Sequence, residues 1–160
     1  MAAVKGAVLG LLLDAYRRRD RVALVTFRGT VAEVALPPTG SVERAAATLE
    51  ALVTGGGTPL AAGLARAEAL VSAERRRDPE RRALVLAVTD GRASGGAAGR
   101  EAARDAAAAL ARTADGVVVF DGEEGPVRLG LAAEIARAAG APLLPLARLQ
   151  PTPERPRRAA

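Results

Sequence analysis

The sequence predicts an α/β protein built on a Rossmann-like, doubly wound, mostly parallel sheet with one antiparallel hairpin at its edge. Short apolar runs typical of buried strands alternate along the chain with longer amphipathic stretches typical of helices. Glycine clusters and prolines separate these segments. Two consecutive apolar runs joined by a short polar turn predict the hairpin.

A helix is expected over residues 2–18, where apolar residues recur at helical spacing. The β-rich run 21–27 and the alternating run 31–36 then flank a short turn and predict the hairpin. Pro37 and Pro38 are expected to end its second strand, because proline cannot donate a backbone hydrogen bond.

Two helices should follow the hairpin. Ser41 is the expected N-cap of a helix that runs to about Leu52. After a glycine-rich loop, Thr58 as N-cap and Pro59 in the first helical position predict a helix to about Glu74.

The run 83–88 is apolar on both faces, as expected of a strand inside a parallel sheet. Asp90 follows it after Thr89, at the edge where open α/β sheets bind ligands. The remaining expected elements are a flexible loop over 91–99, a helix over 100–111, a strand over 117–120, an acidic loop, a helix over 129–138 and a strand over 142–146. The acidic residues of that loop, Asp121, Glu123 and Glu124, are expected to form solvated surface.

Composition excludes several kinds of chemistry. The chain has no Cys and no His, which rules out disulfides, zinc fingers and Ser-His-Asp triads. Any metal must therefore bind oxygen ligands, as Mg²⁺ does. We expect a single domain over residues 1–148 and a disordered Pro/Arg-rich tail over 149–160.

The net charge of +5 comes from short arginine runs. With only 2% aromatic residues there is no stacking platform between them, so we expect solvated surface and no nucleic-acid partner. An acidic protein partner stays compatible with this charge. The apolar run 7–13 is far shorter than the roughly 20 residues of a membrane span. A cytoplasmic protein without a membrane span is expected.

Five segments carry a more specific signal: 1–29, 35–43 (ALPPTGSVE), 54–64 (TGGGTPLAAGL), 76–93 (ending in VTDGRA) and 125–141. Together they resemble the carboxyl-terminal von Willebrand factor A domain of magnesium chelatase D subunits, and more closely the similar subunits assigned to cobalt chelatases. The resemblance covers roughly residues 1–146 in unbroken order. It implies an interaction module that is not an enzyme on its own and that binds no nucleotide.

In that family the module joins an AAA+ ATPase subunit to a large porphyrin-binding subunit while Mg²⁺ or Co²⁺ enters a tetrapyrrole, in chlorophyll-type or cobalamin biosynthesis. The sequence leaves the choice between the two metals open. It also leaves open an inactive gene fragment and a Rossmann-like nucleotide-binding enzyme using the glycines of 91–99. The enzyme alternative is weakened because no G-x-x-x-x-G-K-[ST] occurs and Lys5 is the only lysine.

The resemblance also implies part of a metal-ion-dependent adhesion site. In the wider family this site combines an Asp-x-Ser-x-Ser loop after the first strand with a Thr and an Asp from two later loops. Thr58 and Asp90 match the latter two, and no Asp-x-Ser-x-Ser occurs in this sequence. At most weak Mg²⁺ binding is therefore expected. Thr58 as a helix cap and Asp90 as a turn cap are the alternatives.

The chain opens directly in a helix, so the family's first strand is missing, either because the chain is a fragment or because its function has dispensed with it. That strand is central in the family topology, between 21–27 and 83–89. Without it both neighbours would expose backbone groups and apolar surface. We therefore expect marginal stability, with these strands either closing on each other or accepting a strand from a partner.

Overall fold

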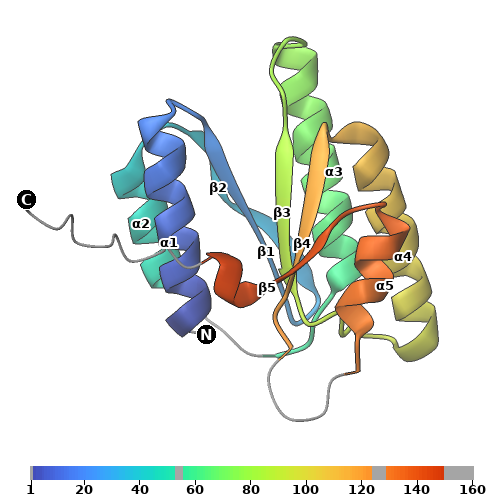
Figure 1. The fold of residues 1–160 in the computed structure, drawn as a ribbon. Helices are drawn as coiled ribbons and strands as arrows, with labels where there is room; N and C mark the ends of the chain where they lie inside the picture. The colour runs from blue at the N-terminus through green and yellow to red at the C-terminus, as the bar shows by residue number, and fades with distance from the viewer. Residues whose placement is uncertain (1, 53–55, 124–128, 150–160) are drawn as a thin grey trace, which may run out of the picture.

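The computed structural model describes residues 2–52, 56–123 and 129–149. Helices pack around two small sheets, which confirms the predicted α/β class (Figure 1). One sheet is the antiparallel pair β1–β2, and the other holds β3, β4 and β5 in parallel. None of the helices in these ranges is long and apolar enough to cross a bilayer.

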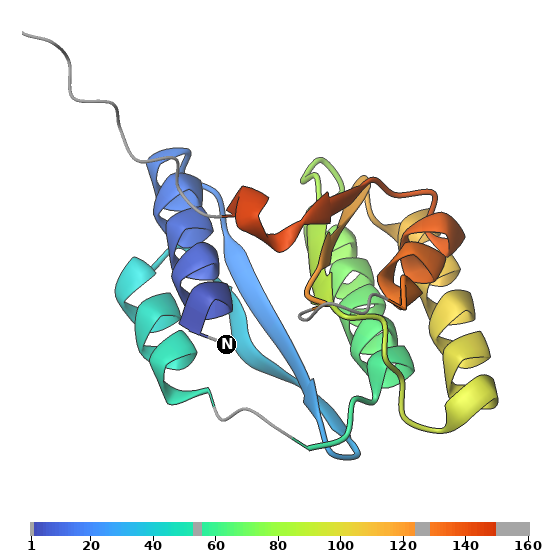
Figure 2. The same cartoon turned by 60° about the horizontal axis from the view of Figure 1, so that its bottom comes forward.

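The first half of the chain forms a helix–hairpin–helix unit. Its elements are α1 (Ala2–Arg17), β1 (Val22–Arg28), β2 (Val31–Thr39) and α2 (Val42–Ala51). Both helices lie on the same side of the hairpin (Figure 2), where Leu36, Ala45 and Leu49 form a small core. The predicted cap at Ser41 is confirmed, because its Oγ accepts the Arg44 backbone N–H at 3.2 Å.

The second hairpin strand does not end at the prolines as predicted. β2 continues through Pro37 and Pro38 to Thr39, which lies opposite Val22. Two properties make this possible: β2 is an edge strand, and its register with β1 shifts between Val22 and Val25. A proline can be accommodated where its missing N–H would face solvent or a bulge.

The second half of the chain builds the parallel sheet and its helices. Its elements are α3 (Leu60–Arg77), β3 (Leu84–Thr89), α4 (Gly96–Thr113), β4 (Gly116–Asp121), α5 (Leu131–Ala138), β5 (Leu143–Pro145) and the 3₁₀ turn η1 (Leu146–Leu149). Leu149 is buried beside Phe120, so packed structure extends one residue past the expected domain boundary at 148. The rest of the expected tail lies outside the described residues.

Helix α4 begins earlier than the sequence suggested. The expected flexible loop over 91–99 is shorter, because Gly95 and Gly96 adopt positive φ and Gly96 already starts the helix. The Gly99 N–H donates to the Gly95 carbonyl at 3.2 Å. A Cβ at Gly99 would come within 1.9 Å of the Ser94 carbonyl oxygen, so this tight entry requires glycine.

The two sheets are separate. In the described residues β1 pairs only with β2 and β3 pairs only with β4, so closing of β1 onto β3, one of the two outcomes that the sequence left open, does not occur. Burial reflects this arrangement. No residue of β1 is buried, and Leu84 and Leu86 of β3 are 66% and 37% exposed. The middle strand β4, by contrast, buries Val117, Val119 and Phe120.

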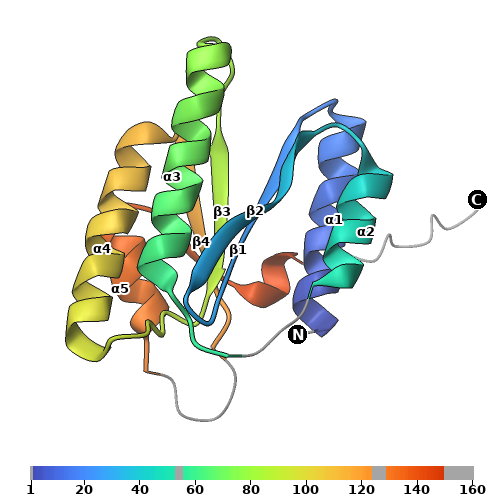
Figure 3. The same cartoon turned by 180° about the vertical axis from the view of Figure 1, so that it is seen from behind.

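Helix α3 packs on the hairpin and on α4, and its buried side chains share the main core with the parallel sheet (Figure 3). Its Leu60 and Leu64 belong to the main core with Val119 of the parallel sheet, and Phe27 of β1 packs against the same core. The contact with the hairpin is close, because a Cβ on Gly63 would lie 2.3 Å from the Phe27 ring. This helix therefore joins two sheets that share no hydrogen bonds.

The opposite end of α3 is fixed by charge. The Asp115 carboxylate accepts the Ala83 backbone N–H and the Arg75 guanidinium, each at 2.8 Å. The bond from Ala83, together with the positive charge of Arg75, lowers the pKa of Asp115 below its ordinary value. The end of α3 and the starts of β3 and β4 thus meet at one carboxylate.

The close contact between Gly63 and Phe27 leads to a prediction. Gly63→Ala should lower the free energy of unfolding by about 1–3 kcal/mol, because the added methyl group overpacks the ring. Gly6→Ala is the matched control: Gly6 is helical and, its own helix backbone and chain neighbours aside, no atom lies within 4 Å of the place its methyl group would take, so alanine should raise stability by up to about 1 kcal/mol. Chemical denaturation measures both, and a Gly63→Ala protein as stable as Gly6→Ala would contradict the bridging role of α3.

Candidate functional site

Three loops meet at the carboxyl edge of the sheets. The turn between β1 and β2 donates the Gly29 N–H to the Gly57 carbonyl at 2.8 Å. The Thr58 N–H donates to Ser94 Oγ, and the Ser94 N–H donates to the Thr58 carbonyl, both at 2.9 Å. We call these three bonds the loop clamp. The clamp brings Thr58 and the loop that carries Asp90 to the same edge of the molecule.

Thr58 does not cap α3 as predicted. The N-cap position belongs to Pro59, and no side chain caps this helix. The Thr58 carbonyl instead accepts the Leu60 N–H at 2.8 Å as well as the bond from Ser94. The backbone of Thr58 thus belongs to the loop clamp. Its partner Ser94 lies far along the chain, so the local sequence could not predict this interaction.

Asp90 lies directly after β3 in a fixed turn. The buried Thr89 hydroxyl accepts the Gly91 N–H at 2.9 Å, and Asp90 Oδ1 accepts the Arg92 N–H at 3.0 Å. Gly91 has φ +74°, and a Cβ there would lie 2.2 Å from the Ala132 nitrogen. Asp90 therefore caps its own turn, which is the alternative that the sequence left open.

The carboxylates in the described ranges are too few at the carboxyl edge to hold a metal ion by themselves. No group of three or more Asp, Glu, His or Cys is placed there to hold a metal ion. Asp90 Oδ2 lies 3.5 Å from Arg92 Nε, so both carboxylate oxygens already contact Arg92. One hydroxyl from Thr58 and one carboxylate from Asp90 would leave an octahedral ion held mainly by water.

The prediction that the acidic loop after β4 is solvated surface is wrong for Glu123, which is buried. Glu123 is only 7% exposed, and its carboxylate accepts the N–H groups of Leu129 at 2.6 Å and Gly130 at 3.1 Å. A negative charge just before α5 also favours the helix dipole. Its spacing from the helix matches no local capping motif, so nothing in the sequence signalled this role. Glu124 lies outside the described residues.

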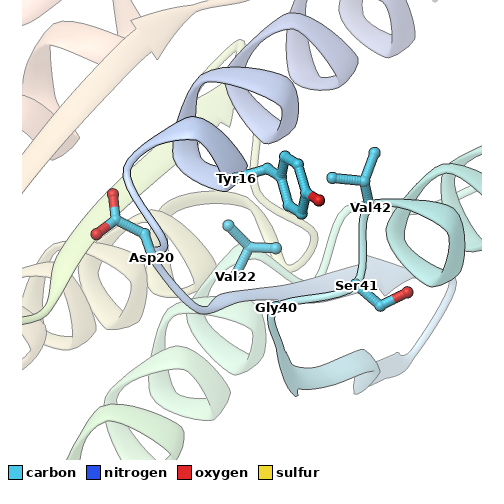
Figure 4. Close-up of a pocket in the computed structure, with 6 residues that line it drawn as sticks. All are labelled: Tyr16, Asp20, Val22, Gly40, Ser41 and Val42. Carbon is cyan, nitrogen blue, oxygen red and sulfur yellow. The ribbon is translucent and has the colours of Figure 1, made fainter.

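A shallow pocket lies at the other end of β1 (Figure 4). Its lining residues are Tyr16, Asp20, Val22, Gly40, Ser41 and Val42. Ser41 already serves the cap of α2, and Thr58 and Asp90 are not part of this surface. The pocket is therefore separate from the carboxyl-edge loops, which remain the candidate site.

The arrangement of strands, helices and carboxyl-edge loops agrees with the comparison to protein families. The family model of the von Willebrand factor type A domain matches residues 1–92. The chain belongs to this family.

Relatives of known sequence extend the similarity over most of the chain. The uncharacterized protein Rv2850c of Mycobacterium tuberculosis is 50% identical over 149 residues, which are 93% of this chain and 24% of that protein. The magnesium-chelatase 60 kDa subunit of Cereibacter sphaeroides is 43% identical over 155 residues, which are 92% of this chain and 27% of that subunit. The chain spans about a quarter of the length of these relatives.

A solved structure shows the same fold. Conserved hypothetical protein BatB from Bacteroides thetaiotaomicron superposes with a TM-score of 0.60 at 21% identity, over 90% of this chain and 77% of that one. At this identity the likeness concerns the fold alone.

Replacing Glu123 by Ala should lower the free energy of unfolding by about 2 kcal/mol, because two partly buried hydrogen bonds to a charged acceptor are lost. Glu123→Gln keeps the shape and one carbonyl acceptor, so its loss should be smaller. Urea denaturation of the three proteins tests the order. Equal midpoints would show that Glu123 does not hold the start of α5.

Proposed function

We propose that this chain is the von Willebrand factor A interaction module of a D-type subunit of a magnesium or cobalt chelatase. In this role it joins the AAA+ ATPase subunit to the large porphyrin-binding subunit while ATP hydrolysis drives the metal into a tetrapyrrole. The supporting observation is the similarity to the Cereibacter sphaeroides magnesium-chelatase subunit across 92% of this chain. It includes the carboxyl-edge segments of Thr58 and Asp90.

The chemistry of the carboxyl edge fits a binding role better than a catalytic one. The Asp90 carboxylate accepts a hydrogen bond within its own turn, and the backbone N–H and carbonyl of Thr58 both belong to the loop clamp. The glycines of 91–99, which the nucleotide-binding alternative would use around phosphates, serve the fold instead. Gly95 and Gly96 form the entry to α4, Gly99 lies against Ser94, and Gly91 lies against Ala132. The alternative of an inactive gene fragment predicts no partner at all, so a binding experiment separates it from our proposal.

The test uses the purified chain with the purified ATPase subunit and the purified large subunit of a chelatase. We expect saturable binding to at least one of them and no steady-state ATP hydrolysis by the chain alone. Calorimetry measures the first and a phosphate-release assay the second. ATP turnover that disappears in an Asp90→Ala variant would contradict the proposal, and failure to bind either subunit would favour the inactive fragment.

Magnesium at Thr58 and Asp90 is proposed to bind only weakly. Because two protein oxygens leave most of the ion's shell to water, the dissociation constant should be in about the millimolar range or weaker. Titration calorimetry with MgCl₂ measures it. A micromolar affinity that Thr58→Ala removes would show that other residues complete the site.

A further inference from the structure

Positive charge is concentrated at the edge opposite the carboxyl-edge loops. Segments 14–21, 74–82 and 112–115 contain ten arginines and six carboxylates. Outside these segments and the run 150–160, ten basic residues are balanced by eleven acidic ones. The three segments contain the ends of α1, α3 and α4 and lead into β1, β3 and β4, so they lie where these strands begin (Figure 1). We call this surface the basic edge.

Ion pairs join the segments of the basic edge to one another. Arg21, before β1, and Arg77 both contact the Glu74 carboxylate of α3, at 3.3 and 2.7 Å. Arg75 contacts Asp115, before β4, at 2.8 Å. The hairpin, the end of α3 and the start of β4 therefore contribute to one connected surface.

The charge of this surface is not balanced. Four of its six carboxylates each contact an arginine, whereas Asp20 and Glu80 form no ion pair with any described residue. Five exposed arginines likewise have no ion pair among the described residues: Arg17, Arg19, Arg76, Arg82 and Arg112. We call these five the free arginines. The surplus of charge is thus positive and exposed to solvent.

Arg19 is held in a backbone conformation that glycine would adopt more easily. Its φ is +61°, and no other non-glycine residue in the described ranges has a positive φ. The Arg19 N–H donates to the Tyr16 carbonyl at 2.9 Å. The Asp20 N–H donates to the Ala15 carbonyl at 2.9 Å, which completes the bond pattern of a helix end whose left-handed residue is usually glycine. Strained residues of this kind cluster at functional sites, so the arginine side chain has a use other than folding.

The same turn borders a recess. A surface hollow of about 480 Å³ is lined by Tyr16, Arg17, Arg19, Asp20 and Gly40. Three of these residues also line the shallow pocket of Figure 4. Two free arginines and Tyr16, which is 58% exposed, offer an acidic side chain both positive charge and an aromatic surface. Asp20 is the carboxylate of this lining, and its charge opposes such a ligand.

We propose that the basic edge binds an acidic segment of a partner polypeptide, with carboxylates of the partner paired to the free arginines and one acidic side chain seated in the hollow. This inference rests on the proposed function, to which it adds the surface that faces another chelatase subunit. Arginine suits this ligand, because its planar guanidinium group donates two parallel hydrogen bonds to one carboxylate.

A polynucleotide fits the basic edge less well. Single strands are bound through aromatic side chains that stack on the bases as well as through charge. Tyr16 is the only aromatic residue of the three segments. Asp20 and Glu80 also lie among the free arginines, where they repel a backbone that carries a negative charge at every nucleotide. An acidic polypeptide can place neutral residues opposite these two carboxylates.

Single substitutions at the basic edge test the proposal. Arg17→Gln and Arg76→Gln each remove an exposed charge without breaking an ion pair, so folding should be retained and subunit binding should weaken roughly three- to fivefold. Arg66→Gln is the matched control. Arg66 is exposed without an ion pair in the described part of the chain, but it precedes Arg76 by about 15 Å along α3. Its binding should be unchanged, and Asp20→Asn should bind more tightly. Equal binding by all four variants would overturn the proposal.

Arg19→Gly separates binding from folding. Glycine adopts a φ of +61° without strain, so this variant should unfold at the same or a higher urea concentration than the unsubstituted protein. Its subunit binding should nevertheless weaken roughly three- to fivefold, because the hollow loses a free charge. Greater stability together with unchanged binding would contradict the proposal.

Salt dependence and a peptide probe distinguish this proposal from the proposed function. Added NaCl should weaken subunit binding, since salt screens exposed charges beyond about 10 Å at 0.1 M. If a subunit binds and neither salt nor these substitutions matter, the basic edge is not the docking surface but the proposed function stands. If neither subunit binds, a peptide of alternating Glu and Gly decides, with a Gln and Gly peptide as control. Binding of the acidic peptide alone, weakened in Arg76→Gln, supports the basic edge, and no binding overturns it.

The last comparison concerns other polyanions. A single-stranded oligonucleotide and phosphatidylserine vesicles are measured beside the acidic peptide at equal salt. Both should bind more weakly than the peptide. Tighter binding to either, weakened in Arg76→Gln, would assign the basic edge to a nucleic acid or a membrane surface and overturn the proposal.

Discussion

The packing of α3 across two unjoined sheets is the contact on which the rest of the structure depends. Sheets normally gain their cohesion from continuous hydrogen bonding, yet here β1 and β3 belong to separate ladders. Burial of Leu60 and Leu64 against the parallel sheet and the close contact of Gly63 with Phe27 replace that bonding. Apolar burial of this kind is non-directional, so it holds the hairpin near the parallel sheet without setting a strand register.

The parts of the fold that the sequence predicted are those with a local cause. The hairpin follows from alternation around a polar turn, the parallel strands from runs that are apolar on both faces, and the start of α2 from Ser41. The errors have nonlocal causes. Pro37 and Pro38 remain in β2 because the strand lies at an edge. Helix α4 starts at Gly96 because Gly95 and Gly96 adopt positive φ directly after Ser94, which is bonded to the distant Thr58.

The candidate site shows the same division. Topology alone predicts that a residue after β3 and a residue before α3 reach the same edge, and the clamp joins their loops. The partner of Thr58 could not be predicted, because Ser94 lies 36 positions along the chain. The turn cap made by Asp90 is local, since its bond reaches only to Arg92, and the sequence had left it open as an alternative. Glu123 is the clearest miss, since a carboxylate in a polar loop gives no indication that it is buried.

The loop clamp connects the state of the sheets to the state of the candidate site. Gly57 binds the β1–β2 turn while its neighbour Thr58 binds the loop after β3, so two adjacent residues span the line between the sheets. Any change in the separation of β1 and β3 must therefore stretch these bonds or carry the Thr58 and Asp90 loops with it. Interiors packed as closely as Gly63 against Phe27 do not absorb such shifts by gradual deformation.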